Sequence, residues 1–167
     1  MQVTTIAVKD LREKTGAGVM DCKKALIEAE GDFDKAIAVL NQHGFDLARK
    51  KNDRVANQGI VDVYVHAGDQ IGAMVEVNCE TDFVAHTDEF KELAHNIALQ
   101  IAAMSPQFIA PDEMPPEADV EPQEVCLLLQ PFIKDSNKTI QDIITETIAK
   151  VGENIKVRRF TRFELGC

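Results

Sequence analysis

Apolar side chains in residues 1–44 recur at the three- and four-residue spacing of amphipathic helices. A first helix is predicted around Val8 and Leu11, and the turn Gly16-Ala17-Gly18 follows it. The second helix is predicted from an apolar stripe formed by Cys22, Ala25, Leu26 and Ala29. A third helix is expected to begin at the capping residue Asp32 and to end at Gly44. Its stripe comprises Phe33, Ala36, Ile37 and Leu40.

A change of pattern follows this predicted three-helix bundle. Residues 49–54 are mostly charged and are the predicted linker, so the domains are expected at residues 1–54 and 55–167. Residues 60–65 and 71–77 are rich in β-forming side chains, and Ala67-Gly68-Asp69 between them predicts a hairpin. The second strand should have one apolar face, because apolar residues alternate at Ile71, Ala73, Val75 and Val77.

The remaining residues predict two more helices and a final strand. The strongest helical stripe comprises Phe90, Leu93, Ala94, Ile97, Ala98, Ile101 and Ala102, and Ser105-Pro106 should end that helix. Residues 110–122 hold four prolines and five acidic residues, which predicts a loop. Another helix face at residues 140–151 should stop at Gly152.

Residues 155–165 read as a strand, in which Arg158-Arg159 breaks the alternation and predicts a bulge. This order of elements predicts an α+β fold, in which a small N-terminal three-helix bundle precedes an antiparallel sheet packed with helices.

Composition narrows the classes of function. The chain has a net charge of −10, and Lys91 is the single basic residue between residues 55 and 133. A phosphate-binding surface needs the opposite charge, so direct nucleic-acid binding by this region is not expected. A basic protein partner or solubility accounts better for the acidity. No apolar run approaches a membrane span, and the amino terminus resembles neither a signal nor a transit peptide, so a cytoplasmic protein is expected.

Residues capable of catalysis or metal binding are scattered. Four cysteines occur without a CxxC pair or metal-ligand spacing, so reduced thiols and no metal or cofactor are expected. The sequence has no glycine-rich phosphate loop, HExxH or GxSxG motif, which favours a protein that is not an enzyme. An acid–base pair of Asp82 with Glu80 or Asp88 is the remaining enzymatic interpretation, and caps or solvated charges explain these carboxylates better.

Spacing alone does not decide between a structural and a functional role at two places in the sequence. Asp82 and Phe83 lie at a strand-to-helix junction, where functional residues concentrate. Spacing alone favours a structural role over a functional one, in which Asp82 caps the helix and Phe83 packs back onto it as a hydrophobic staple. On the second helix Met20 and Ile27 lie off the core stripe beside lysines, which suits either a docking surface or cover for the bundle edge.

Four motifs in order resemble the elongation factor Ts family. They are residues 11–26 (LREKTGAGVMDCKKAL), 77–84 (VNCETDFV), 130–135 (QPFIKD) and 152–160 (GENIKVRRF). The resemblance implies that the N-terminal module is ubiquitin-associated-like and that the partner is the GTPase elongation factor Tu. It implies that Asp82 and Phe83 form a wedge into the partner, while Thr81 and Val84 shape the turn. Met20 and Lys23 match the family's N-terminal partner contacts, and Lys51 matches a second, weaker basic position.

The resemblance therefore predicts a guanine nucleotide exchange factor that binds elongation factor Tu in its GDP-bound and nucleotide-free states. The magnesium of the nucleotide belongs to the partner, so no cofactor is expected here. The chain is shorter than many family members near residues 110–122, and functions placed in that insert do not carry over. The alternative is a ubiquitin-associated-like adaptor that binds a helix or peptide without exchange activity. An exposed edge strand and Cys167 also suggest a homodimer.

Overall fold

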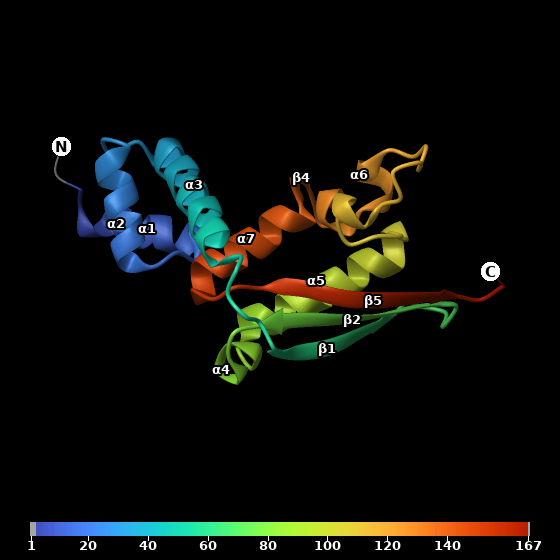
Figure 1. Cartoon of the computed structure of the whole chain (residues 1–167). Coiled ribbons are helices and arrows are strands. Elements are labelled where there is room, and N and C mark those ends of the chain that lie inside the picture. Colours follow the sequence, from blue (N-terminus) through green and yellow to red (C-terminus); the bar gives the residue numbers. More distant parts are fainter. Residues whose placement is uncertain (1–2, 167) are drawn as a thin grey trace.

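A computed structural model describes residues 3–166, and it begins with the predicted bundle. The three helices are α1 (Thr5–Thr15), α2 (Val19–Glu28) and α3 (Phe33–Lys51), which lie together at one end of the molecule (Figure 1). The predicted stripe of α2 is buried, and it packs with residues of α1 and α3 in a small core of its own. That core comprises Val8, Leu11, Cys22, Ala25, Leu26, Ala29, Ala36 and Leu40.

Local hydrogen bonds define the ends of these helices. Gly16 adopts the left-handed conformation after α1, and Gly18 precedes α2, so the predicted turn is confirmed. The side chain of Asp32 accepts a hydrogen bond from the Lys35 N–H at 2.9 Å, which confirms the predicted cap of α3.

The predicted end of α3 at Gly44 is wrong, because the helix continues to Lys51. Gly44 is buried against α7, and a Cβ there would lie 3.4 Å from the Cβ of Ala149. The glycine therefore permits close packing of two helices. Arg49, Lys50 and Lys51 form the last turn of α3, where positive charge is favourable, so only the residues after Lys51 link the bundle to the sheet.

The second unit is built on a three-stranded antiparallel sheet with the order β1-β2-β5. Its strands are β1 (Gln58–Val65), β2 (Ile71–Cys79) and β5 (Lys156–Glu164), and the first two form the predicted hairpin. The predicted bulge is also confirmed. Glu76 pairs with Arg159 and Val77 with Val157, which leaves Arg158 as the extra residue of β5.

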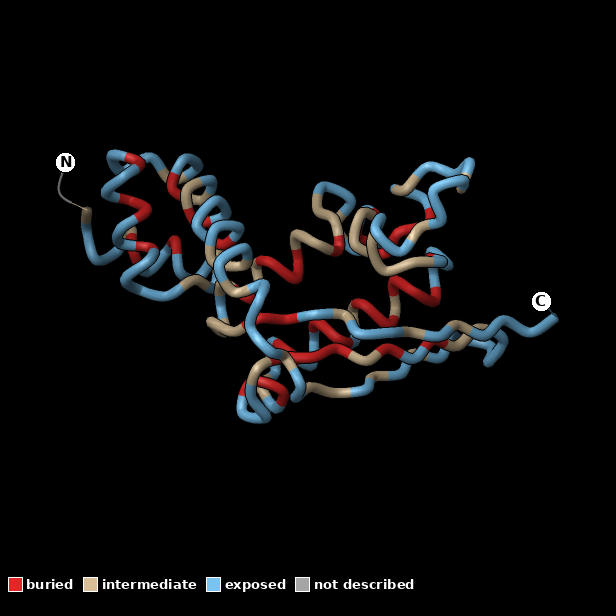
Figure 2. Tube along the Cα trace, in the orientation of Figure 1, coloured by how far each residue is buried: buried red, intermediate tan, exposed pale blue. Residues whose placement is uncertain are grey.

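Helices cover one face of this sheet. The helices α4 (Asp82–Ala85) and α5 (Asp88–Met104) pack on the strands, and α7 (Ile140–Val151) packs on α5 and α3. Figure 2 shows buried segments along β2, α5 and α7, and the predicted alternation of β2 is confirmed by the burial of Ala73, Val75 and Val77. Ser105 ends α5 and Gly152 ends α7 in left-handed conformations, as predicted.

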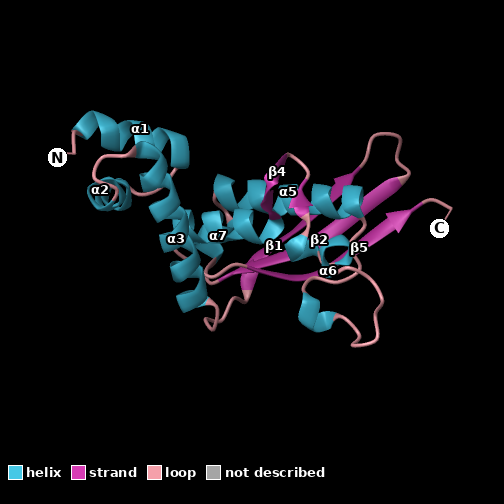
Figure 3. Cartoon of the chain, turned by 90° about the horizontal axis from the view of Figure 1, so that it is seen from above, coloured by secondary structure: helices cyan, strands magenta, loops and turns pink. Residues whose placement is uncertain are grey.

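The acidic, proline-rich segment lies beyond the end of α5 (Figure 3). Short elements follow one another here: the 3-10 helix η1 (Pro111–Glu113), α6 (Pro122–Val125), the 3-10 helix η2 (Leu127–Leu129), β3 (Pro131–Phe132) and β4 (Asp135–Thr139). Buried Gln100 of α5 donates a hydrogen bond to the carbonyl of Pro131 at 3.1 Å and so ties this segment to the core.

Three cysteines of the described chain, Cys22, Cys79 and Cys126, are buried and unpaired. Burial raises the pKa of the Cys79 thiol to about 11, and its Sγ donates to the carbonyl of Thr81 at 3.0 Å. The expectation for Cys167 lies outside the described residues. Within residues 3–166 no helix is long and apolar enough to cross a membrane.

The β1–β2 hairpin yields a test of the fold at Gly59. This residue has φ +147°, and a Cβ would lie 2.8 Å from the Asn78 Cα and closer still to the Val77 carbonyl oxygen. We expect Gly59→Ala to lower the free energy of unfolding by about 1–3 kcal/mol, measured by urea denaturation. Gly72→Ala is the matched control, because its new Cβ would have no neighbour nearer than 3.9 Å. Equal stability of the two variants would contradict this account of the hairpin.

Candidate functional site

Phe83 is the most exposed large apolar residue of the described chain, with 80% of its surface open to solvent. It lies on the four-residue helix α4, between the end of β2 and the start of α5 (Figure 1). The staple interpretation is therefore wrong, because Phe83 does not pack back onto the protein. A large aromatic residue held open on a well-packed scaffold is typical of a binding surface.

The cap of α4 is Thr81, and the interpretation of Asp82 as the cap is also wrong. The Oγ1 of Thr81 accepts a hydrogen bond from the Val84 N–H at 3.3 Å, and Asp82 is the first residue of the helix. Val84 and Ala85 are buried beneath the turn. Burial of these two small side chains fixes α4 on the core and leaves Asp82 and Phe83 exposed together.

The chain after Phe83 also contributes to this turn. The Nδ1–H of His86 donates a hydrogen bond to the Asp82 carbonyl oxygen at 2.6 Å. Thr87 caps α5 by accepting from the Phe90 N–H at 3.3 Å. Asp82, Phe83, His86 and Thr87 border a shallow hollow of 390 Å³ beside the exposed ring. The surface therefore offers an apolar ring, a carboxylate and an imidazole within one turn.

Residues from the far end of the chain support the turn at residues 81–85 that carries Phe83, and the sequence analysis predicted no role for them. Both oxygens of Glu153 accept hydrogen bonds from Thr81, one from its N–H at 3.0 Å and one from its hydroxyl at 2.7 Å. The neighbouring Glu80 accepts from the Asn154 N–H at 2.7 Å. The signal available in the sequence was the polar pair directly after the helix-ending Gly152.

The hydrogen bonds and charges around Glu80 favour its ionised carboxylate. The Asn154 N–H lowers the pKa of Glu80 below its ordinary value, burial opposes this, and Arg54 at 3.4 Å lowers it further. Because the ordinary value is already acidic, Glu80 is ionised at neutral pH. A carboxylate engaged by two donors is poorly placed as a general base, which removes Glu80 from the acid–base interpretation.

The second surface predicted from the sequence lies on α2. Met20 and Ile27 are 62% and 57% exposed, and Lys23 and Lys24 beside them are exposed as well. An apolar pair that leaves most of its area open favours a docking surface over a bundle edge. Lys51 lies elsewhere, at the end of α3, where its ammonium donates to the Gly152 carbonyl oxygen. The structure thus brings Met20 and Lys23 together but separates them from Lys51.

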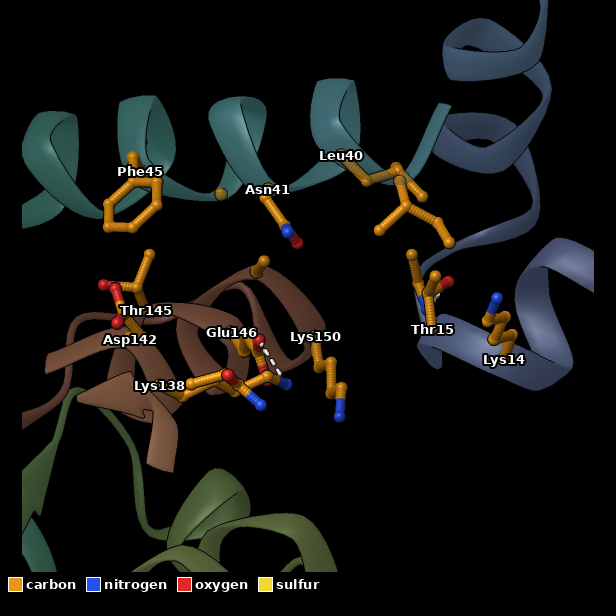
Figure 4. A pocket seen from close by; sticks show the side chains of 15 residues that line it. Lys14, Thr15, Leu40, Asn41, Phe45, Lys138, Asp142, Thr145, Glu146 and Lys150 are labelled. Atoms are coloured by element: carbon orange, nitrogen blue, oxygen red, sulfur yellow. Dashed lines mark hydrogen bonds and ion pairs between the residues drawn. The ribbon is translucent and has the colours of Figure 1, made fainter. Parts of the chain in front are cut away.

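A groove of 550 Å³ runs between α3 and α7 (Figure 4). Leu40 and Phe45 line it from α3, and Thr145 lines it from α7. Its acidic groups are engaged locally, because Glu146 pairs with Lys138 at 2.7 Å and Asp142 forms the capping box of α7 with Thr139. The groove therefore presents mainly apolar walls and gathers no set of groups suited to catalysis. Nor do residues 3–166 hold any group of three metal-binding side chains.

Comparison with known proteins gives a consistent relationship over the whole chain. The family model described as "Elongation factor TS" matches residues 4–123. The chain is 48% identical to elongation factor Ts of Carboxydothermus hydrogenoformans, over 98% of this chain and 89% of that protein. It is also 48% identical to elongation factor Ts of Thermoanaerobacter sp. (strain X514), over 98% of this chain and 95% of that protein.

A third relative gives the same result. Elongation factor Ts of Methylacidiphilum infernorum is 48% identical over 95% of this chain and 93% of its own length. The alignment with the Carboxydothermus protein extends over 194 positions whereas this chain has 167 residues, so that relative carries residues that this chain lacks. Both the family match and the identity over nearly full length show that this chain belongs to the elongation factor Ts family of translation elongation factors.

Proposed function

We propose that this protein is a guanine nucleotide exchange factor for the translational GTPase elongation factor Tu. It binds the GDP-bound partner, accelerates GDP release and leaves a nucleotide-free complex that GTP then enters. Membership of the elongation factor Ts family supports the identity of the partner. The observation that carries the mechanism is the exposure of Phe83 on a turn fixed by Thr81 and Val84. No covalent bond is made or broken.

In this mechanism Asp82 and Phe83 act as a wedge. The Phe83 ring enters an apolar crevice of the partner's GTPase domain, and the Asp82 carboxylate accepts hydrogen bonds at its rim. Magnesium bridges the GDP phosphates to such a GTPase and supplies much of the grip on the nucleotide. A wedge that displaces the helices near that site loosens metal and nucleotide together. By linkage, bound nucleotide weakens the hold on the factor to the same extent.

The N-terminal module provides a second contact in this proposal. Met20 supplies an adaptable apolar side chain, and Lys23 supplies a positive charge beside it. Lys51 is the second basic position that the family resemblance indicates. Its ammonium already donates to the Gly152 carbonyl, so a contact with the partner uses the remaining N–H groups.

Further partners follow from the surface and the family. The proposal includes action in the cytoplasm, and it involves neither a membrane nor a directly bound nucleic acid as partner. A homodimer is also proposed, because the uncovered face of the sheet exposes Val61, Val63, Val65, Met74 and Phe163. Sedimentation velocity tests it, and a single monomeric species up to high concentration would exclude the dimer.

The alternative function is a ubiquitin-associated-like adaptor. The exposed Met20 and Ile27 favour the adaptor, because they suit a docking surface. The adaptor function leaves the exposed Phe83 without a role. The two functions differ in one experiment. Protein is mixed with elongation factor Tu that carries fluorescent GDP, and nucleotide release is followed by stopped flow. Faster release supports the exchange factor, and binding with unchanged release supports the adaptor.

The wedge predicts the behaviour of Phe83→Ala. Loss of a large aromatic at the centre of an interface typically costs about 2–4 kcal/mol, so GDP release should slow by a corresponding factor while the fold is retained. Phe45→Ala is the matched control, because Phe45 is 43% exposed on α3 and lies outside the turn that carries Phe83. The wedge is wrong if a folded Phe83→Ala variant still releases GDP at the wild-type rate.

The N-terminal contact predicts weaker binding by Met20→Ala. We expect a loss of about 1–2 kcal/mol in binding free energy to nucleotide-free partner, measured by calorimetric titration. Met104→Ala is the control, because Met104 is a 45% exposed methionine at the end of α5. Equal affinities for the two variants would show that this part of α2 does not touch the partner.

The role of the partner's magnesium predicts how exchange depends on its concentration. If the wedge loosens the metal site, the acceleration of GDP release should shrink when chelator has already removed magnesium. Some acceleration should remain, because the displaced helices also disturb the phosphate-binding loop. The measurement is GDP release with and without the factor across free magnesium concentrations. A constant acceleration from saturating to negligible magnesium would exclude metal loosening as part of the mechanism.

A further inference from the structure

We infer that Glu153, in the loop between α7 and β5, is a positioning residue for the exchange wedge. This inference rests on the proposed function of Asp82 and Phe83. Glu153 itself does not belong to the wedge, and its carboxylate acts through Thr81, the residue that starts the wedge turn.

The contact with Thr81 is a two-point clamp. One oxygen of Glu153 accepts from the Thr81 N–H at 3.0 Å, and the other accepts from the Thr81 hydroxyl at 2.7 Å. Because the Thr81 hydroxyl donates its hydrogen bond to Glu153, a lone pair of its oxygen faces the Val84 N–H, which donates to it at 3.3 Å. Glu153 therefore sets both the backbone and the side-chain rotamer of the cap.

The wedge helix depends on such a cap because it is very short. The α4 helix has four residues, and a single turn orders several backbone dihedrals for few internal hydrogen bonds. Thr81 satisfies one of its otherwise unpaired N–H groups. A Thr81 side chain that rotates freely would therefore loosen the turn that carries Phe83.

The loop that carries Glu153 is itself fixed on both sides. Gly152, with φ 75°, ends α7, and its carbonyl accepts from Lys51. On the other side Asn154 is only 2% exposed, and its Nδ2 donates to the carbonyls of Asn52 and Arg54 at 3.2 and 2.8 Å. The clamp on the wedge is thus anchored to the residues that leave the N-terminal module.

Glu153 is half-buried and its contacts with Thr81 lie at the surface, unlike those of the buried Asn154. Replacing it should therefore alter the wedge more than the fold. Glu153→Gln keeps an oxygen that accepts from the Thr81 N–H but loses the second acceptor. Glu153→Ala loses both. The matched control is Glu146→Gln. Glu146 lies on α7, the helix that precedes the Glu153 loop, and its substitution removes the 2.7 Å ion pair with Lys138 without affecting Thr81.

The test uses the full-length chain with elongation factor Tu carrying fluorescent GDP. We expect Glu153→Ala to lower the maximal rate of GDP release about tenfold, Glu153→Gln to lower it less, and Glu146→Gln to leave it unchanged. The factor concentration at half-maximal rate should stay near the wild-type value, because the α2 surface is intact. Glu153→Gln has nearly the shape of the native side chain and keeps the comparison on folded protein.

Two further measurements separate positioning from general stability. In a Phe83→Ala background the Glu153 variants should cause no additional loss of rate, since there is no ring left to position. Amide hydrogen exchange should quicken at Thr81 and Val84 but not in β2 or α7. Wild-type rates for both variants, the same loss in the Phe83→Ala background, or unchanged exchange at Thr81 and Val84 would each overturn the inference.

Failure of the proposed function has a different signature. If Phe83→Ala alone keeps the wild-type rate, the wedge is wrong and Glu153 has no role in exchange. If Phe83→Ala slows release while the Glu153 variants do not, the wedge stands and the clamp is wrong.

Discussion

The structure depends on one buried amide, the side chain of Asn154. A polar group removed from water must be hydrogen-bonded, and this one donates to two carbonyls in the chain that leaves α3. Its backbone N–H simultaneously binds Glu80 at the end of the sheet. The end of the bundle, the residue before the α4 turn and the loop that leads into β5 are therefore joined by a single set of hydrogen bonds. No described residue has a buried side-chain nitrogen or oxygen without a partner, so this junction is fully satisfied.

The turn at residues 81–85 contains both buried residues that hold it on the core and residues that are exposed. Val84 and Ala85 face the core, and they pack α4 against the sheet. Phe83 leaves most of its ring in water, which is unfavourable for an isolated folded chain and gains free energy only when a partner covers the ring. Because the turn is already ordered, little conformational freedom remains to be lost on binding. Packing of Val84 and Ala85 in the core thus offsets the unfavourable exposure of the Phe83 ring to water.

Periodic patterns in the sequence predicted correctly which side chains of a strand or helix face the core. The alternation of Ala73, Val75 and Val77 and the stripe of α5 report directly which side chains face the core, and both were confirmed. Gly44 was misread because its role depends on α7, a helix distant in sequence. Thr81 and Asp82 are both good capping residues, so spacing could not choose between them. The contact of Glu153 with Thr81 spans 72 positions and leaves no periodic trace in the sequence. At Phe83 spacing favoured a packed staple, and only the structure shows that the ring is exposed.

The unbroken α3 helix has a consequence for how partners are distinguished. Since α3 extends from the bundle onto α7, and α7 packs on α5, a continuous set of packed helices connects the bundle that carries the exposed α2 surface with the turn that carries Phe83. A protein that meets both surfaces loses its translational freedom once, and the second contact then forms at a high effective concentration. Under the proposed function, a related GTPase with a similar crevice but a different spacing would engage one surface at a time and lose that advantage. In the proposed function, the length of α3 helps to set the distance between the two partner contacts, so selectivity among GTPases would rest on geometry as well as on the chemistry of either contact.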